Sequence, residues 1–135
     1  MSFQWLELRI IEEKERRARE AAILARLPGA VEELRESLTS CVEAYTGAFG
    51  ESAAVLTQDG LRLTVASEGK EVEVIADPTL PGFQVQHEGG SLAVQVGLLP
   101  GSNLFYLDVA ADKYLSMDEL TRKILDRVMF PKLKE

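Results

Sequence analysis

Apolar residues in the first third of the chain recur every three or four positions, which is the period of an amphipathic helix. The pattern covers Phe3–Leu27 and Ala30–Thr46, so it predicts two N-terminal helices. Pro28-Gly29 lies between them. Because proline lacks an amide proton and clashes with the preceding helical turn, we expect the chain to reverse there as a helical hairpin. The spacing of Leu24 and Leu27 continues through the proline, which leaves one kinked helix as the alternative.

From Ala53 the period changes to two, the period of a β-strand with one buried face. Turn signals and one irregular stretch, Asp77–Gly82, divide this region into six strands. The turns Asp59-Gly60, Glu68-Gly69, Gly89-Gly90 and Pro100–Asn103 pair Leu56 with Leu63, Val65 with Val72, Val85 with Val94, and Leu98 with Phe105. The apolar residues then share one face: Leu63, Val65, Val72, Val74, Val94, Val96, Phe105 and Leu107. This pattern predicts an antiparallel meander with one buried face and one solvent-facing side, the open face.

A last helix is predicted after Ser116, which forms the capping-box spacing with Glu119. Its buried stripe consists of Met117, Leu120, Ile124 and Val128. The predicted fold is therefore α+β. It has two N-terminal helices, a six-stranded antiparallel meander with one face covered by helices, and a C-terminal helix. All of residues 1–135 are expected to form one domain.

The charge pattern excludes some partners. The net charge is −7, and nearly all of the negative charge lies in residues 30–116, so we expect neither nucleic acid nor an anionic membrane as a partner. A protein with a basic surface is the better expectation. The start of the chain lacks a signal-peptide pattern, and the single cysteine, Cys41, excludes an intrachain disulfide, so we expect a cytoplasmic protein.

Few residues are candidates for chemistry. His87 is the only histidine, which excludes a multi-histidine metal site within one chain, and its strand parity places it on the apolar face beside Leu92. Cys41 lies in the apolar seam of the second predicted helix, where a small, inert thiol is expected. The glycine-rich stretches lack phosphate-loop spacing, and we predict no cofactor, no metal and no catalytic residue.

The open face of the predicted sheet is the candidate binding surface. It gathers polar side chains and one aromatic ring, namely Arg62, Thr64, Gln84, Gln86, Gln95 and Tyr106, together with the carboxylates of Glu71, Glu73 and Asp108. Such a face most often meets water. The acidic character, the length and the helices around a sheet resemble type III secretion chaperones in general shape. The short Asp77–Gly82 stretch, however, leaves no room for the helix that those proteins have between their strand groups.

The first predicted helix favours a protein-interaction function. Its charged middle, Glu12–Glu20, has acidic residues four positions before basic ones in Glu12/Arg16, Glu13/Arg17 and Glu15/Arg19, an order that stabilises an exposed helix. We expect this middle to be solvated, and Trp5, Leu6 and Ile10 to be buried partly by a second subunit.

Three classes of function follow, in order of preference. The first is a non-enzymatic, homodimeric interaction module, adaptor-like or chaperone-like. The second is a small-ligand-binding domain with a pocket between helices and sheet, lined by Tyr45, Phe83, Phe105 and Tyr114. An enzyme comes third, because no nucleophile is paired with a base.

Overall fold

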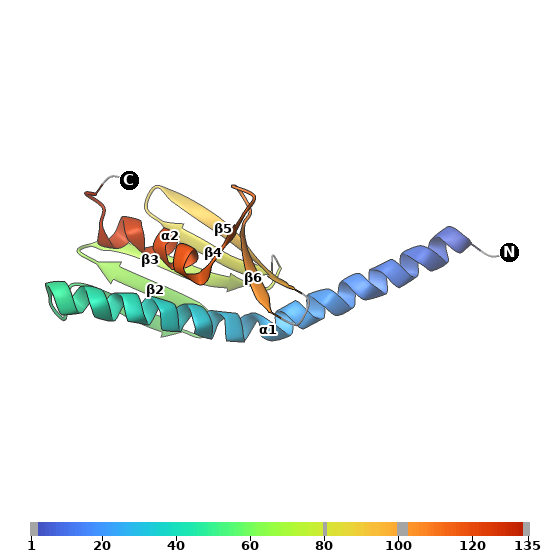
Figure 1. The fold of residues 1–135 in the computed structure, drawn as a ribbon, viewed down its shortest axis with the longest axis horizontal. Coiled ribbons are helices and arrows are strands. Elements are labelled where there is room, and N and C mark those ends of the chain that lie inside the picture. The colour runs from blue at the N-terminus through green and yellow to red at the C-terminus, as the bar shows by residue number, and fades with distance from the viewer. Residues whose placement is uncertain (1–2, 80, 100–102, 134–135) are drawn as a thin grey trace.

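The computed structural model describes residues 3–79, 81–99 and 103–133. These residues form a long helix, α1 (Gln4–Phe49), a seven-stranded sheet and a second helix, α2 (Met117–Met129). The strands are β1 (Val55–Asp59), β2 (Arg62–Ser67), β3 (Lys70–Asp77), β4 (Gly82–His87), β5 (Gly90–Leu98), β6 (Leu104–Asp108) and β7 (Lys113–Leu115). Each strand pairs antiparallel with the next, so the sheet is a meander. The part of α1 after residue 26 packs with α2 and the sheet, whereas its beginning extends past the sheet (Figure 1).

The two predicted N-terminal helices are one helix, so the hairpin prediction is wrong and the kinked helix is correct. Pro28 lies inside α1 and has no amide proton for the carbonyl of Leu24, and α1 bends where it leaves the sheet (Figure 1). Leu27, Ala30 and Val31 are buried on both sides of the proline. Their burial holds the helical path across a residue that would end an isolated helix.

The predicted strand register is correct for β2 and β3, where Val65 pairs with Val72. Two other hairpins differ by two residues. Leu56 pairs with Val65 rather than Leu63, and Val94 pairs with Phe83 rather than Val85. The turns begin one residue away from the predicted centres, and because side chains alternate with a period of two, a two-residue shift keeps each of them on its predicted face.

The predicted register of β6 is wrong by one residue. Leu98 pairs with Leu104 instead of Phe105, so the connection has an odd number of residues; its residues 100–102 lie outside the described part of the chain. A one-residue shift turns the strand over. Tyr106 and Asp108 therefore face the core, and Phe105 and Leu107 lie on the open face, half-buried.

The sequence analysis also missed β7, which adds a seventh strand at the β6 edge of the sheet. It is too short to show a period of two. The preceding Asp112 has φ 51°, a left-handed turn conformation in which Asp is tolerated better than most residues.

The core lies between the helices and the inner face of the sheet. Leu34 and Leu38 of α1 and Leu120 and Ile124 of α2 are fully buried there. The sheet contributes Leu63, Val65, Val72, Val74, Phe83, Val85, Val94 and Val96. The capping box predicted at Ser116 and Glu119 is confirmed.

Candidate functional site

Six of the exposed large apolar side chains among the described residues lie close together at the beginning of α1. We call residues 3–22 the arm, because Ile23 is the first residue of α1 that packs against the core. The arm projects away from the rest of the molecule, which we call the body (Figure 1). At about 1.5 Å per residue it is roughly 30 Å long. Because the arm projects away from the body, it presents all sides of a helix to solvent.

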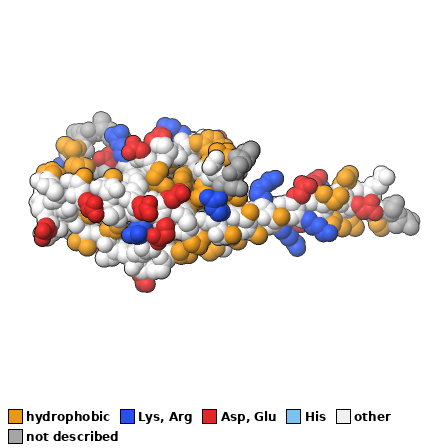
Figure 2. Space-filling view, turned by 60° about the horizontal axis from the view of Figure 1, so that its bottom comes forward, with side chains coloured by type: hydrophobic (Ala, Val, Ile, Leu, Met, Phe, Trp, Pro, Cys, Tyr) orange, Lys and Arg blue, Asp and Glu red, His pale blue; other side chains and the backbone are white. Residues whose placement is uncertain are grey.

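Large apolar side chains gather at the end of the arm (Figure 2). Their exposed fractions are 49% for Phe3, 66% for Trp5, 41% for Leu6, 60% for Leu8, 45% for Ile10 and 55% for Ile11. They point to more than one side, because a helix turns by about 100° per residue. Trp5, Leu6 and Ile10 were expected to be buried partly by a second subunit, and in the single chain they are exposed. A helix that is apolar on several sides is normally covered by protein on those sides.

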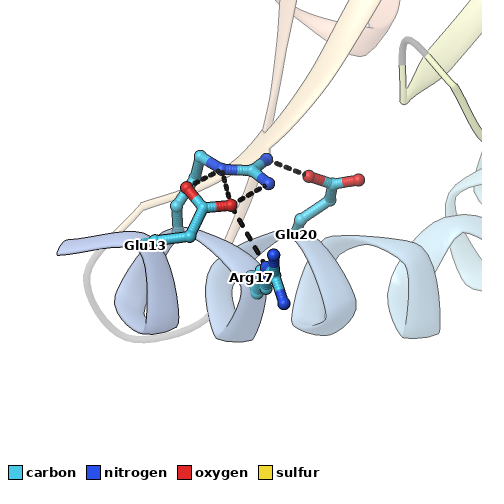
Figure 3. A network of polar contacts seen from close by, with 4 residues as sticks. Glu13, Arg17 and Glu20 are labelled. Atoms are coloured by element: carbon cyan, nitrogen blue, oxygen red, sulfur yellow. Dashed lines mark hydrogen bonds and ion pairs between the residues drawn. The ribbon is translucent and has the colours of Figure 1, made fainter. Parts of the chain in front are cut away.

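Ionic contacts hold the middle of the arm in helical form (Figure 3). Arg16 lies 2.7 Å from Glu13 and 2.6 Å from Glu20, and Arg17 lies 3.1 Å from Glu13. The hydrogen bonds from Arg16, and then those from Arg17, lower the pKa of Glu13 to about 2, and the same contacts raise the pKa of Arg16. Of the predicted pairs, Glu13/Arg17 is confirmed. Arg16 bonds Glu13 and Glu20 instead of Glu12.

Five of the six predicted binding residues share the open face of the sheet. The strand pairing places Arg62, Thr64, Gln84, Gln86 and Gln95 there. None of them lines either of the two pockets described below. Arg62 is paired with Glu73 at 3.3 Å, and the amide nitrogen of Gln84 lies 3.4 Å from a carboxylate oxygen of Asp77. The arrangement is that of a solvated strand surface.

Tyr106, the sixth, lies on the opposite face, as does Asp108. Tyr106 is 5% exposed, stacks on Phe83 with the ring centroids 6.2 Å apart, and donates a hydrogen bond of 3.2 Å to Glu33. Burial, and then the Glu33 carboxylate, raise the pKa of Tyr106. The side chain of Asp108 is 4% exposed and pairs with Lys123 at 3.4 Å. Both residues join the sheet to the helices and are not part of the open face.

His87 lies on the inner face of the sheet at the β4–β5 turn, as predicted, and is half-buried. It lines an open pocket of about 680 Å³ between that turn and α2. Other residues of the wall are Ser91, Glu119, Arg122, Lys123, Asp126 and Arg127. Among the described residues, the one hydrogen-bond contact of the imidazole is with the carbonyl of Glu88, 3.4 Å from Nδ1. The histidine is thus bonded neither to the hydroxyl of Ser91 nor to a carboxylate of the pocket.

A second, more apolar groove of about 520 Å³ lies between α1 and α2. Its wall includes Cys41, Ala44, Tyr45, Ala48, Phe49, Leu125, Met129 and Phe130. The hydroxyl of Tyr45 donates to the carbonyl of Met129 at 3.2 Å. Burial, with a smaller contribution from Asp118, raises the pKa of the half-buried Cys41 thiol, which disfavours the reactive thiolate.

The four aromatic residues expected to line one pocket lie in three separate places. Tyr45 is in the groove between the helices, and Phe83 is in the core against Tyr106. Phe105 and Tyr114 contact each other at 5.4 Å between ring centroids, on the open face at the β6–β7 edge. The pocket predicted between helices and sheet is therefore not formed by these residues.

No protein-family model, curated protein or solved structure matches this chain. Among the described residues there is no cluster of three or more potential metal ligands. Within the same residues, neither helix has an apolar stretch long enough to cross a membrane.

The sequence analysis missed that the arm is detached from the body. The sequence does contain the signal. Six large apolar residues between Phe3 and Ile11 surround the helix axis, whereas a helix on a sheet needs one apolar side. The apolar seam through Leu24 and Leu27 predicts only the part of α1 that the body covers, and it does not show that the arm extends beyond it.

Proposed function

We propose that this chain is a non-enzymatic protein-interaction module, adaptor-like or chaperone-like, that works as a homodimer and uses the arm as its binding surface. One observation carries the proposal. The arm exposes six large apolar side chains on a helix that no other described segment covers. Exposed apolar patches of this kind mark protein contacts in soluble proteins, because covering them removes apolar area from water.

The distribution of charge supports a second, basic partner for the body. Residues 49–116 carry nine acidic and three basic groups, whereas the arm carries five of each. An acidic body attracts a positively charged protein surface and repels nucleic acid. The single cysteine is compatible with the reducing cytoplasm, where we place the protein.

Light scattering of the purified chain tests the proposal. At tens of micromolar we expect a mass twice the 14.9 kDa of the single chain. Leu8→Glu places a charge on the arm and should give a single-chain mass. Leu61→Glu makes the same change at an exposed leucine of the body and should leave the dimer intact. A single-chain mass for the wild type would refute self-association.

A second candidate function is the binding of a small apolar ligand in the groove between α1 and α2. Its volume of about 520 Å³ falls within the range of small-molecule sites, roughly 300–1,000 Å³, and its wall is mostly apolar. Native mass spectrometry of freshly purified protein should then show a co-purified molecule. Ala48→Trp, which fills the groove, should remove that molecule while the dimer remains.

A further inference from the structure

One side of α1 carries an apolar stripe that the body leaves uncovered. It consists of Leu8, Ile11, Ala18, Ala22 and Ala25, interrupted by the acidic Glu15; the six positions are spaced 3-4-3-4-3, and we call them the outer stripe. All six residues are exposed. Ile23 and Leu27, which pack against the core, lie on the opposite side of the helix. A stripe with this spacing is the kind that packs against another helix.

We infer that a second copy of this chain binds the outer stripe with its own outer stripe, in antiparallel orientation. The inference rests on the self-association proposed above and specifies its geometry. The first reason is size. The large residues, Leu8 and Ile11, lie at one end of the stripe and the alanines at the other.

An antiparallel pair places Leu8 against Ala25 of the second copy, and Ile11 against its Ala22, so that each contact combines a large and a small side chain. A parallel pair would place large against large at one end. At the other end it would leave alanines facing alanines, where close contact is lost.

Charge is the second, independent reason. Residues 7–15 carry four acidic and two basic groups, and residues 16–22 carry three basic and one acidic. Antiparallel pairing brings the acidic half of each arm beside the basic half of the other. In particular, Glu12 and Arg19 border the outer stripe on the same side. In the antiparallel pair, Glu12 therefore lies beside Arg19 of the second copy, and Arg19 lies beside its Glu12.

The parallel alternative brings like charges together at the same borders of the stripe. Glu7 would lie beside Glu12 of the second copy, and Lys14 beside its Arg19. Flanking charges of this kind determine which orientation two helices adopt. They add to the preference for the antiparallel pair that the apolar contacts give.

Glu12 pairs with Arg9 of its own chain at 2.9 Å, and because both side chains are exposed, this contact is exchanged or shared with Arg19 of the second copy in the dimer. The other ion pairs of the single arm are compatible with this pairing. Glu13, Arg16, Arg17 and Glu20 lie on the side of the arm away from the outer stripe, so their network (Figure 3) persists in the dimer. Pairing also leaves the apolar residues of that other side, such as Leu6 and Ile10, outside the interface, which differs from the expectation that a second subunit buries them. They remain available to a different partner.

Cross-linking of cysteine variants tests the orientation. In a Cys41→Ala background, which removes the native thiol, Leu8→Cys chains are mixed with Ala25→Cys chains that carry a distinguishable tag. A short bis-maleimide reagent should join the two different chains. Leu8→Cys chains alone should not cross-link, because in the antiparallel pair their thiols lie on the order of 25 Å apart, 17 residues along the helix.

The possible results separate the two proposals. Cross-linking of Leu8→Cys chains to each other would overturn the antiparallel orientation and leave the dimer standing. A chain that stays monomeric by light scattering and forms neither product would overturn self-association and this inference together. The same result, a monomer without either cross-linked product, is expected if the arm binds only an unrelated protein.

Charge reversal is a second test that does not depend on thiols. Glu12→Arg should weaken the dimer about tenfold, because two exposed attractive pairs become repulsive. Arg19→Glu should do the same, and the double variant should restore the wild-type dissociation constant. In a parallel pair each single change would instead replace a repulsion by an attraction. Tighter association of the single variants would therefore overturn the antiparallel arrangement.

Discussion

Ile11→Ala is the change whose effect on the dimer can be worked out most directly. The substitution removes three carbon groups, worth about 2.4 kcal/mol when fully buried, at about 0.8 kcal/mol each. Ile11 is 55% exposed in the single chain, so roughly half of that, about 1.3 kcal/mol, remains to be gained on pairing. A dimer contains two copies, which gives about 2.6 kcal/mol, or a dissociation constant about 70-fold weaker. The free energy of unfolding of the single chain should change by less than about 0.5 kcal/mol.

Ile10→Ala is the matched control. Ile10 is the same residue type, is 45% exposed and is adjacent in sequence, but it lies off the outer stripe. Sedimentation equilibrium of both variants should give a much weaker dimer for Ile11→Ala and a nearly unchanged one for Ile10→Ala. Equal weakening by both would show that the arm is covered without a preferred side. A larger effect of Ile10→Ala would refute the outer stripe as the interface.

Three further predictions concern the body. Gly82→Ala should lower the free energy of unfolding in urea by about 3 kcal/mol, because a Cβ there meets the backbone carbonyl of Val94, which cannot move aside. Ser116→Ala should lower it by about 1 kcal/mol through loss of the N-cap of α2, with an unchanged dimer mass. Cys41 should react with a disulfide reagent more slowly than an unstructured cysteine peptide at neutral pH, and its rate should rise only at a more alkaline pH, because burial raises its pKa.

Local sequence signals predicted much of the body. The β2–β3 register was predictable because Glu68 and Gly69 both have positive φ, the requirement of a tight two-residue turn. The capping box of α2 depends on residues three positions apart and was equally visible. Both features are decided within a few residues, so the local sequence was enough to predict them.

The errors arose where distant contacts or the length of a connection decide the structure. Pro28 would end an isolated helix, and only burial of its neighbours on the sheet keeps α1 continuous. The connection before β6 differs by one residue from the expected turn, and this one residue moved Tyr106 from the open face into the core. For that reason Tyr106, the one aromatic residue predicted for the open-face binding surface, does not belong to it.

Trp5 offers the most direct test of whether the arm is covered by a second copy. It is the only tryptophan of the chain, and it is 66% exposed when the chain is alone. It borders the outer stripe, on the side where Glu12 and Arg19 lie. The fluorescence emission of the wild-type protein should therefore lie at a shorter wavelength at tens of micromolar and shift to longer wavelength on dilution to nanomolar, as the dimer dissociates. Emission typical of a solvent-exposed tryptophan at every concentration would contradict the account.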